Sequence, residues 1–209
     1  MKVLLEVHAL KGSDNNGTGS GAPTTIEWRD ATHFRREPGA EWMGVWNRTS
    51  KAYDAIDHDN IRRSSEVNGR LLQRWGWHSA LAAFEPIGNP SEHSDLEELK
   101  TFYREARRQV QYHAPYAYFV FHSMNREDFE FWDDLFPDAY LVAMDTHYSQ
   151  AWKRGLWATG DVCEDYERMA AKADNSKYEV WLGEWSLATD PCAQWLGGFN
   201  DGVAESYTF

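Results

Sequence analysis

The chain has 209 residues, enough for one domain with a sizeable buried core. Its 21 basic and 33 acidic side chains give a net charge of −12, which argues against nucleic acid and anionic membrane surfaces as partners. A neutral polymer such as a glycan is compatible with this charge, and 11 tryptophans, more than a core of this size needs, favour a groove that stacks sugar rings.

Signals for cellular location point in different directions. No apolar run approaches the roughly 20 residues of a membrane span, and residues 2–7 are too short and too acidic for a signal peptide. The sequences Asn16-Gly17-Thr18 and Asn47-Arg48-Thr49 are glycosylation sequons, which have meaning only in a secreted chain. Cys163 and Cys192 either form a disulfide in an oxidising compartment or are two free buried thiols.

The N-terminal part of the chain opens with an apolar segment, residues 2–8, that predicts a strand ending at His8. Residues 12–21 are rich in Gly and Asn and predict a loop. They do not indicate nucleotide binding, because they lack a Gly-Lys-Ser/Thr ending and no GxGxxG opens a helix. Residues 22–50 are expected to be irregular and aromatic, and a helix is predicted from about 60 to 75.

From residue 81 onward, predicted strands and helices alternate. The strands are expected at 81–86, 116–121, 140–144 and 178–184. The helices are expected from the capping box Ser94-x-x-Glu97 to about 110, over roughly 127–135 and over roughly 162–173. Alternation of this kind predicts a parallel sheet with right-handed crossovers.

Polar residues end every predicted strand of this sheet. They are His8, Glu85, His122, Asp145 with His147, and Glu184. Reactive groups that ring the carboxyl edge are typical of a (β/α)8 barrel, whereas a doubly wound sheet concentrates them at one crossover. The sequence therefore predicts the barrel type of α/β fold.

Glu184 is the carboxylate around which this arrangement is centred. It closes a short apolar strand between Trp181 and Trp185, and strict alternation places it on the opposite face from Trp181. A carboxylate at the end of a buried strand is costly unless its charge is used. Retaining glycosidases need such a group as nucleophile, and aromatic rings suit the apolar faces of a sugar. The alternative is a strand-end Glu that caps a helix or pairs with an Arg.

Three segments, taken in order, resemble the exo-β-1,3-glucanase-like branch of glycoside hydrolase family 5. Leu5-Glu6-Val7-His8 with the Gly/Asn loop is similar to the third-strand motif of that branch, and Asp145-Thr146-His147-Tyr148 to its sixth-strand segment. Residues 183–188 with 192–198 are similar to its seventh-strand nucleophile block. The resemblance implies an incomplete (β/α)8 TIM barrel that holds about strands 3 to 7. Residues 1–209 would be a single catalytic domain truncated at both ends, which needs no cofactor.

The resemblance also implies a reaction: retaining hydrolysis of β-glucan O-glycosidic bonds in an extracellular or cell-wall setting, with Glu184 as nucleophile. The family's acid/base is the Glu of an Asn-Glu-Pro triplet ending the fourth strand, four residues after a second Glu. Counted from Glu85, this position holds Asn89, whose amide cannot donate and reclaim a proton. In an alternative register Glu85-Pro86 supplies the acid/base, and the match to Pro90 is lost.

Other residues near the nucleophile take their roles from the same resemblance. His8, His147 and Tyr148 would orient Glu184 or bind the sugar, and Trp185 and Trp152 are candidate stacking platforms. The alternatives are core imidazoles bonded to the backbone and ordinary aromatic packing.

Two other functions are compatible with the sequence. One is a non-catalytic glycan-binding protein that keeps the groove but lacks the proton donor. The other is a metal-assisted barrel hydrolase, although no metal is expected. No His-x-His pair lies on a strand, and the two cysteines are far from zinc-ligand spacing.

Overall fold

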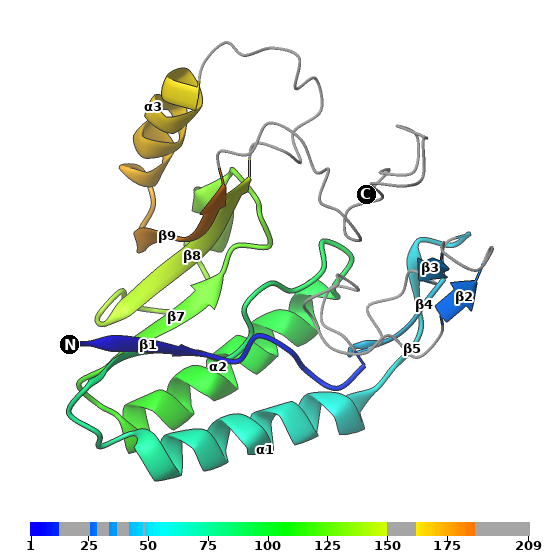
Figure 1. Ribbon diagram of the computed structural model, residues 1–209, viewed down its shortest axis with the longest axis horizontal. Coiled ribbons are helices and arrows are strands. Elements are labelled where there is room, and N and C mark those ends of the chain that lie inside the picture. Colours follow the sequence, from blue (N-terminus) through cyan, green and yellow to red (C-terminus); the bar gives the residue numbers. More distant parts are fainter. Residues whose placement is uncertain (13–25, 29–33, 37–41, 48, 150–161, 187–209) are drawn as a thin grey trace.

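The computed structural model describes residues 1–12, 26–28, 34–36, 42–47, 49–149 and 162–186 (Figure 1). Trp152, Cys192 and the sequon at Asn16 lie outside the described residues, as does the side chain of Cys163. The predictions of a disulfide, of secretion and of a single truncated domain therefore stay predictions.

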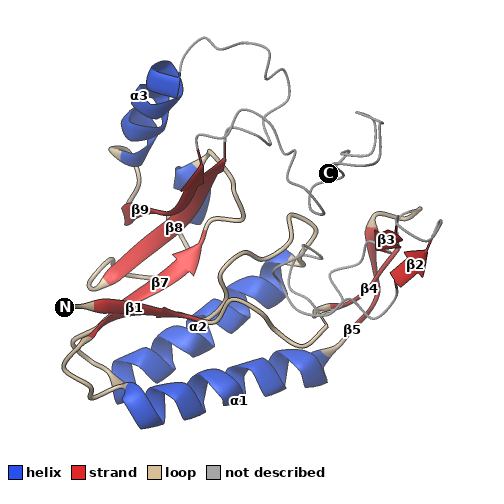
Figure 2. Cartoon of the chain, viewed as in Figure 1, coloured by secondary structure: helices blue, strands red, loops and turns tan. Residues whose placement is uncertain are grey.

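A five-stranded parallel sheet forms the centre of the molecule. Its strands, in spatial order, are β1 (Val3–Glu6), β6 (Leu81–Glu85), β7 (Tyr118–His122), β8 (Val142–Ser149) and β9 (Glu179–Ser186). Every neighbouring pair is parallel. The sheet, with helices between its strands, is the incomplete (β/α)8 barrel that the sequence predicts (Figure 2).

The helices cross over between successive strands. They are α1 (His58–Trp75), α2 (Leu96–His113) and α3 (Val162–Ala173), with a short 3₁₀ turn η1 (Phe129–Trp132). Asp95 caps α2, because its carboxylate accepts the N–H groups of Glu97 and Glu98. The predicted capping box that begins at Ser94 is therefore wrong by one residue.

Two small antiparallel pairs precede α1. They are β2 (Ile26–Trp28) with β3 (Phe34–Arg36), and β4 (Gly44–Asn47) with β5 (Ala52–Ile56). The expectation that residues 22–50 are irregular is wrong for these strands, which are too short to display a clear period of two. Gly44 allows the second pair to form. Its φ is 137°, and a Cβ at this position would lie 2.0 Å from the Ala55 carbonyl oxygen.

The two faces of the sheet carry side chains of different size. The face toward α1 and α2 holds the main core, with Phe84, Phe119, Phe121 and Met144 all buried. The opposite face holds a small cluster of Ala83, Val120 and Ala143. Residues two positions further along each strand lie on this second face, which is how Glu85, His122 and Asp145 come together.

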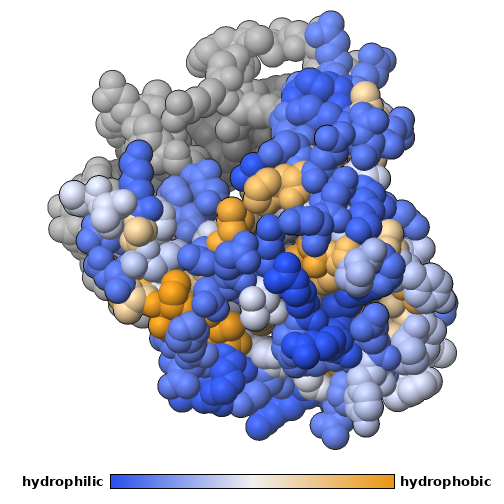
Figure 3. All heavy atoms as spheres, turned by 180° about the vertical axis from the view of Figure 1, so that it is seen from behind, coloured by the Kyte–Doolittle hydropathy of each residue, from blue (hydrophilic) through white to orange (hydrophobic). Residues whose placement is uncertain are grey.

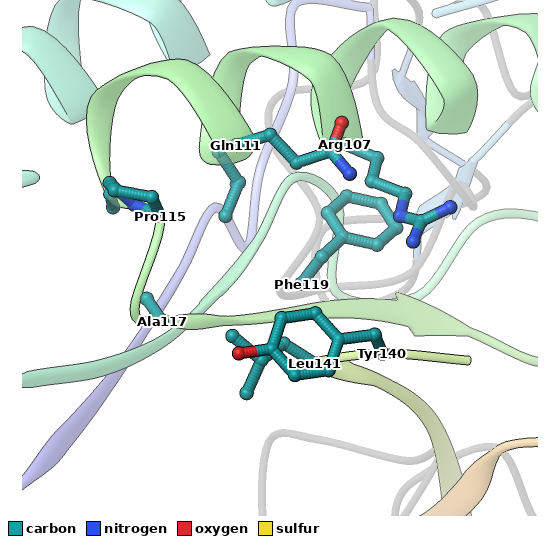
Figure 4. A pocket seen from close by; sticks show the side chains of 9 residues that line it. Arg107, Gln111, Pro115, Ala117, Phe119, Tyr140 and Leu141 are labelled. Carbon is teal, nitrogen blue, oxygen red and sulfur yellow. The ribbon is translucent and has the colours of Figure 1, made fainter. Parts of the chain in front are cut away.

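Two hollows in the described part of the chain lie away from these polar residues. One, of about 100 Å³, is lined by Arg107 and Gln111 of α2 together with Phe119, Tyr140 and Leu141 (Figure 4). It lies at the amino ends of β7 and β8, opposite the edge with the polar strand ends. The other, of about 270 Å³, is apolar and runs along β1 near Trp75.

The surface on the side shown in Figure 3 is largely hydrophilic, with several separate hydrophobic patches. None of the helices in the described part of the chain combines the length and apolar character needed to span a bilayer.

Candidate active site

The carboxylate of Glu184 lies between two imidazoles. Oε2 is 3.5 Å from Nδ1 of His147, and Oε1 is 4.0 Å from Nδ1 of His8. About half of the Glu184 side chain is exposed (54%), so an outside molecule has access to it. The two imidazoles come from strands on opposite sides of the sheet centre, β8 for His147 and the end of β1 for His8.

Each imidazole also contacts a second carboxylate besides that of Glu184. Nε2 of His147 lies 3.0 Å from Oδ2 of Asp145, and Nδ1 of His8 lies 2.7 Å from Oε1 of Glu6. Because a carboxylate only accepts, Nε2 of His147 carries a proton and its Nδ1 faces Glu184. Asp145 is 4% exposed and holds this imidazole in one orientation, as carboxylate–histidine pairs do in many active sites.

A β-bulge in β9 brings Glu184 to this position. Asp145 pairs with Trp181, but His147 pairs with Glu184, so the register shifts by one residue at Gly183. Glu184 therefore lies on the same face as Trp181 and His147. The expectation from strict alternation, which placed Glu184 opposite Trp181, is wrong because of this extra residue. The freed N–H of Gly183 donates to Oδ1 of Asp145 over 2.7 Å.

Glu85 is fully buried beneath this group of side chains. Neither of its oxygens has a hydrogen-bond partner among the described residues. Burial, and then the charges of Asp145, Glu6 and Glu184, together raise the pKa of Glu85 to about 10. Glu85 is therefore a neutral carboxylic acid at pH 7, one strand away from Glu6, with which it is in register.

His122 is fully buried next to His147, with ring centroids 4.4 Å apart. Its Nδ1 accepts the N–H of Met124, which leaves the proton on Nε2. Burial, and then the proximity of His147, lower the pKa of His122 well below its usual value. His122 is a neutral core imidazole bonded to the backbone, and its proton opposes metal coordination through Nε2.

Asn89 lies four residues beyond Glu85, in the loop after β6. Its Oδ1 accepts from Nδ2 of Asn125 at 3.2 Å, in the loop after β7. The backbone between Glu85 and Asn89 passes close to β1, since a Cβ on Gly88 would lie 1.6 Å from Oε1 of Glu6. The position expected for the acid/base thus carries an amide side chain, which is hydrogen-bonded to a second amide.

Not every predicted site residue joins the group. Tyr148 lies on the other face of β8 from His147, and its hydroxyl donates to Asp165 of α3 at 2.9 Å. Trp185 is in register with Tyr148 and is 65% exposed. Neither is brought against Glu184 by the strand geometry, and Trp152 lies outside the described residues.

Sequence reasoning overlooked Glu6 as a member of the site. The signal was present, because Glu6 and His8 are two positions apart at the end of a strand and so share a face. The pairing of Glu6 with His8 mirrors the pairing of Asp145 with His147.

No family model matches the chain. The chain is 26% identical to a probable glucan 1,3-beta-glucosidase A of Aspergillus niger and 23% identical to glucan 1,3-beta-glucosidase 2 of Wickerhamomyces anomalus. Each match covers 100% of this chain and 44% of the relative. The chain therefore spans less than half the length of the curated relatives it matches.

Solved structures show a related fold. Endo-glycoceramidase II from Rhodococcus sp., in a complex with a five-membered iminocyclitol, superposes with a TM-score of 0.52 at 15% identity, over 83% of this chain and 45% of that one. Its lactosyl-enzyme intermediate gives a TM-score of 0.50 at 13% identity, over 91% and 57%. The resemblance to the exo-β-1,3-glucanase-like branch of glycoside hydrolase family 5 is confirmed, and with it the likeness to glycoside hydrolases.

Proposed function

We propose that this chain carries the nucleophile side of a retaining glycoside hydrolase site that acts on β-glucans, with Glu184 as the nucleophile. The observation that carries the proposal is the half-exposed Glu184 carboxylate between two imidazoles at the carboxyl edge of an incomplete barrel. The relatives that are named glucan 1,3-beta-glucosidases support a β-glucan as substrate, and an extracellular or cell-wall setting would follow from it.

The first half of the reaction uses this geometry directly. An oxygen of Glu184 attacks the anomeric carbon, the glycosidic bond breaks, and a covalent glycosyl-enzyme forms. His147, fixed by Asp145, lies beside the second oxygen of Glu184 and limits the positions open to the carboxylate during the attack. His8, paired with Glu6, lies on the other side of the carboxylate and is placed to bind a sugar hydroxyl.

Both halves also need an acid/base group, which protonates the leaving oxygen as the glycosidic bond breaks and later takes a proton from the water that hydrolyses the glycosyl-enzyme. Asn89 cannot do this, and a missing general acid costs about 10²–10⁴ in rate. Glu85 carries the required proton but has no exposed atom, so as acid/base it would have to move toward the substrate. We therefore expect slow hydrolysis of natural glucans by this chain and much faster reaction with substrates that need no proton donor.

A dinitrophenyl β-glucoside provides the test, because its phenolate leaves without protonation. We expect release of dinitrophenolate by the chain and loss of that release in Glu184→Gln. A deoxyfluoro analogue of the same glucoside should label Glu184, as identified by mass spectrometry of the peptides. Glu179→Gln, an exposed carboxylate on the same strand, is the matched control and should behave as the unaltered chain does. Labelling of another residue, or release that survives in Glu184→Gln, would contradict the proposal.

A second candidate function is glycan binding without catalysis, which the amide at position 89 favours. In that case laminarin binds, as measured by calorimetry, while neither laminarin nor the dinitrophenyl glucoside is cleaved. A metal-assisted hydrolase is the third, and it predicts that dialysis against a chelator abolishes cleavage of the glucoside.

A further inference from the structure

Side chains of the two edge strands meet across the mouth of the incomplete barrel. β1 and β9 are the first and last strands of the sheet. Even so, one ligand atom each from Glu6, His8 and Glu184 lie within 4.8 Å of one another. Two carboxylates and one imidazole at such distances can close around a single ion after small rotations of their side chains.

In the part of the chain that the structure describes, the ion pairs of Glu6, Asp145 and Glu184 are all with histidines. Glu85, from the strand next to β1, is fully buried, and both of its oxygens lack a hydrogen-bond partner among the described residues. The charges of Glu6 and Glu184 raise the pKa of Glu85, so several carboxyls crowd together at this point. A bound cation would relieve the repulsion between them.

We propose that Glu6, His8 and Glu184 bind one divalent transition-metal ion of the zinc class, which bridges β1 and β9 and blocks the nucleophile. Oε1 of Glu6, Nδ1 of His8 and an oxygen of Glu184 are its ligands, with a further position open to water. The imidazole ligand favours Zn²⁺ or Co²⁺ over Mg²⁺ and Ca²⁺, which prefer oxygen ligands alone. His147, held by Asp145, fixes the orientation of Glu184 from behind.

One property follows from this assignment. The ion joins the two edge strands in the folded state only, so it raises the unfolding temperature. The blocking of catalysis rests on the proposed role of Glu184, whereas binding and thermal stabilisation do not.

Calorimetric titration of the full chain with Zn²⁺ tests the site. We expect one ion per chain, with affinity lowered about 100-fold or more in Glu6→Gln and in His8→Ala, and Mg²⁺ binding far more weakly. Cobalt absorption spectra should report the same stoichiometry. His58→Ala is the matched control, since His58 pairs with Glu98 at 3.8 Å and no third ligand joins them among the described residues. Its affinity for Zn²⁺ should not change.

The inference is overturned if no ion binds at millimolar Zn²⁺, or if affinity is unchanged in both Glu6→Gln and His8→Ala. Equal losses in those variants and in His58→Ala would overturn it as well. His8→Asn replaces the ring by a smaller polar side chain and repeats the test should His8→Ala unfold. Zn²⁺ should inhibit cleavage of the dinitrophenyl glucoside with a constant equal to its dissociation constant. Cleavage that continues while the ion is bound would contradict the role of Glu184 as nucleophile but not the metal site. If the chain cleaves no substrate, calorimetry alone decides whether the ion binds.

Discussion

Gly183 donates its backbone N–H to Oδ1 of Asp145 across 2.7 Å, and its missing side chain makes this approach possible. A Cβ on Gly183 would lie 2.4 and 2.5 Å from the two Asp145 oxygens, inside van der Waals contact. The bulge that aligns Glu184 with His147 therefore depends on glycine at this position.

The substitution Gly183→Ala is expected to displace Asp145 and lower the free energy of unfolding by about 1–3 kcal/mol. Urea denaturation measures the change. Gly69→Ala is the control, because a Cβ there meets only the Gln109 side chain at 3.5 Å in the middle of α1. That variant should be stabilised by about 0.5–1 kcal/mol. Equal stability of Gly183→Ala and the parent chain would show that the bulge tolerates a side chain.

Glu85 makes the stability of the fold depend on pH. Its pKa in the folded chain is about 10, against 4.5 for an ordinary Glu carboxyl. Between these values the folded state binds more protons than the unfolded state, so the free energy of unfolding falls as the pH rises. The full effect of one such group is about 1.4 kcal/mol per pH unit.

The variant Glu85→Gln keeps the shape of the neutral acid and removes this dependence. We expect it to be more stable than the parent chain at pH 8 and nearly equal to it at pH 4, as measured by urea denaturation at both values. Glu179→Gln, exposed on β9, should leave the slope unchanged. A slope that persists in Glu85→Gln would mean that Glu85 is ionised in the folded chain.

Asn89→Glu tests which register supplies the acid/base. If the amide occupies the position of the proton donor, this change should raise the rate of glucose release from laminarin by about 10²–10⁴. The initial release of dinitrophenolate, which forms the glycosyl-enzyme, should change little, because that step needs no proton donor. Asn89→Asp, whose carboxyl is one methylene shorter, is the control. No gain in Asn89→Glu, together with loss of laminarin cleavage in Glu85→Gln, would support Glu85 instead.

Asp145 should act on the reaction through His147. The Asp145 carboxylate accepts hydrogen bonds from two donors, Nε2 of His147 and the N–H of Gly183. In Asp145→Asn only one oxygen remains, so the amide can accept from only one of these donors as well as the carboxylate does. We expect kcat for the dinitrophenyl glucoside to fall at least about tenfold with little change in KM. An Asp145→Asn variant with unchanged kcat would show that Glu184 needs no support from this pair.

The sequence was sufficient for the strands and for the edge on which the polar residues gather. Short apolar runs ending in His8, Glu85, His122 and Glu184 mark β1, β6, β7 and β9, and parallel strands bring their carboxyl ends to one edge. The helices α1, α2 and α3 were equally visible, since apolar residues such as those of α2 repeat at helical spacing. The helix predicted over roughly 127–135 is only the 3₁₀ turn η1.

Single residues determine the finer geometry, and their effects do not follow from the regular pattern of the surrounding sequence. Gly183 reverses the side on which Glu184 lies, and alternation alone cannot show whether a strand glycine makes a bulge. Tyr148 was grouped with His147 through the family resemblance, although adjacent strand residues face opposite ways. The charges that contribute to the raised pKa of Glu85 come from three other strands, so no local pattern reveals it.

The two faces of the sheet carry different kinds of residues, one for packing and one for the candidate site. Aromatic side chains such as Phe84, Phe119 and Phe121 hold the helices on one side, and the polar residues of the site project from the other. Substitution at a loop position such as Asn89 therefore touches none of the contacts that keep the helices in place. A sheet built in this way can change the residues of one face while its packing on the other face stays intact.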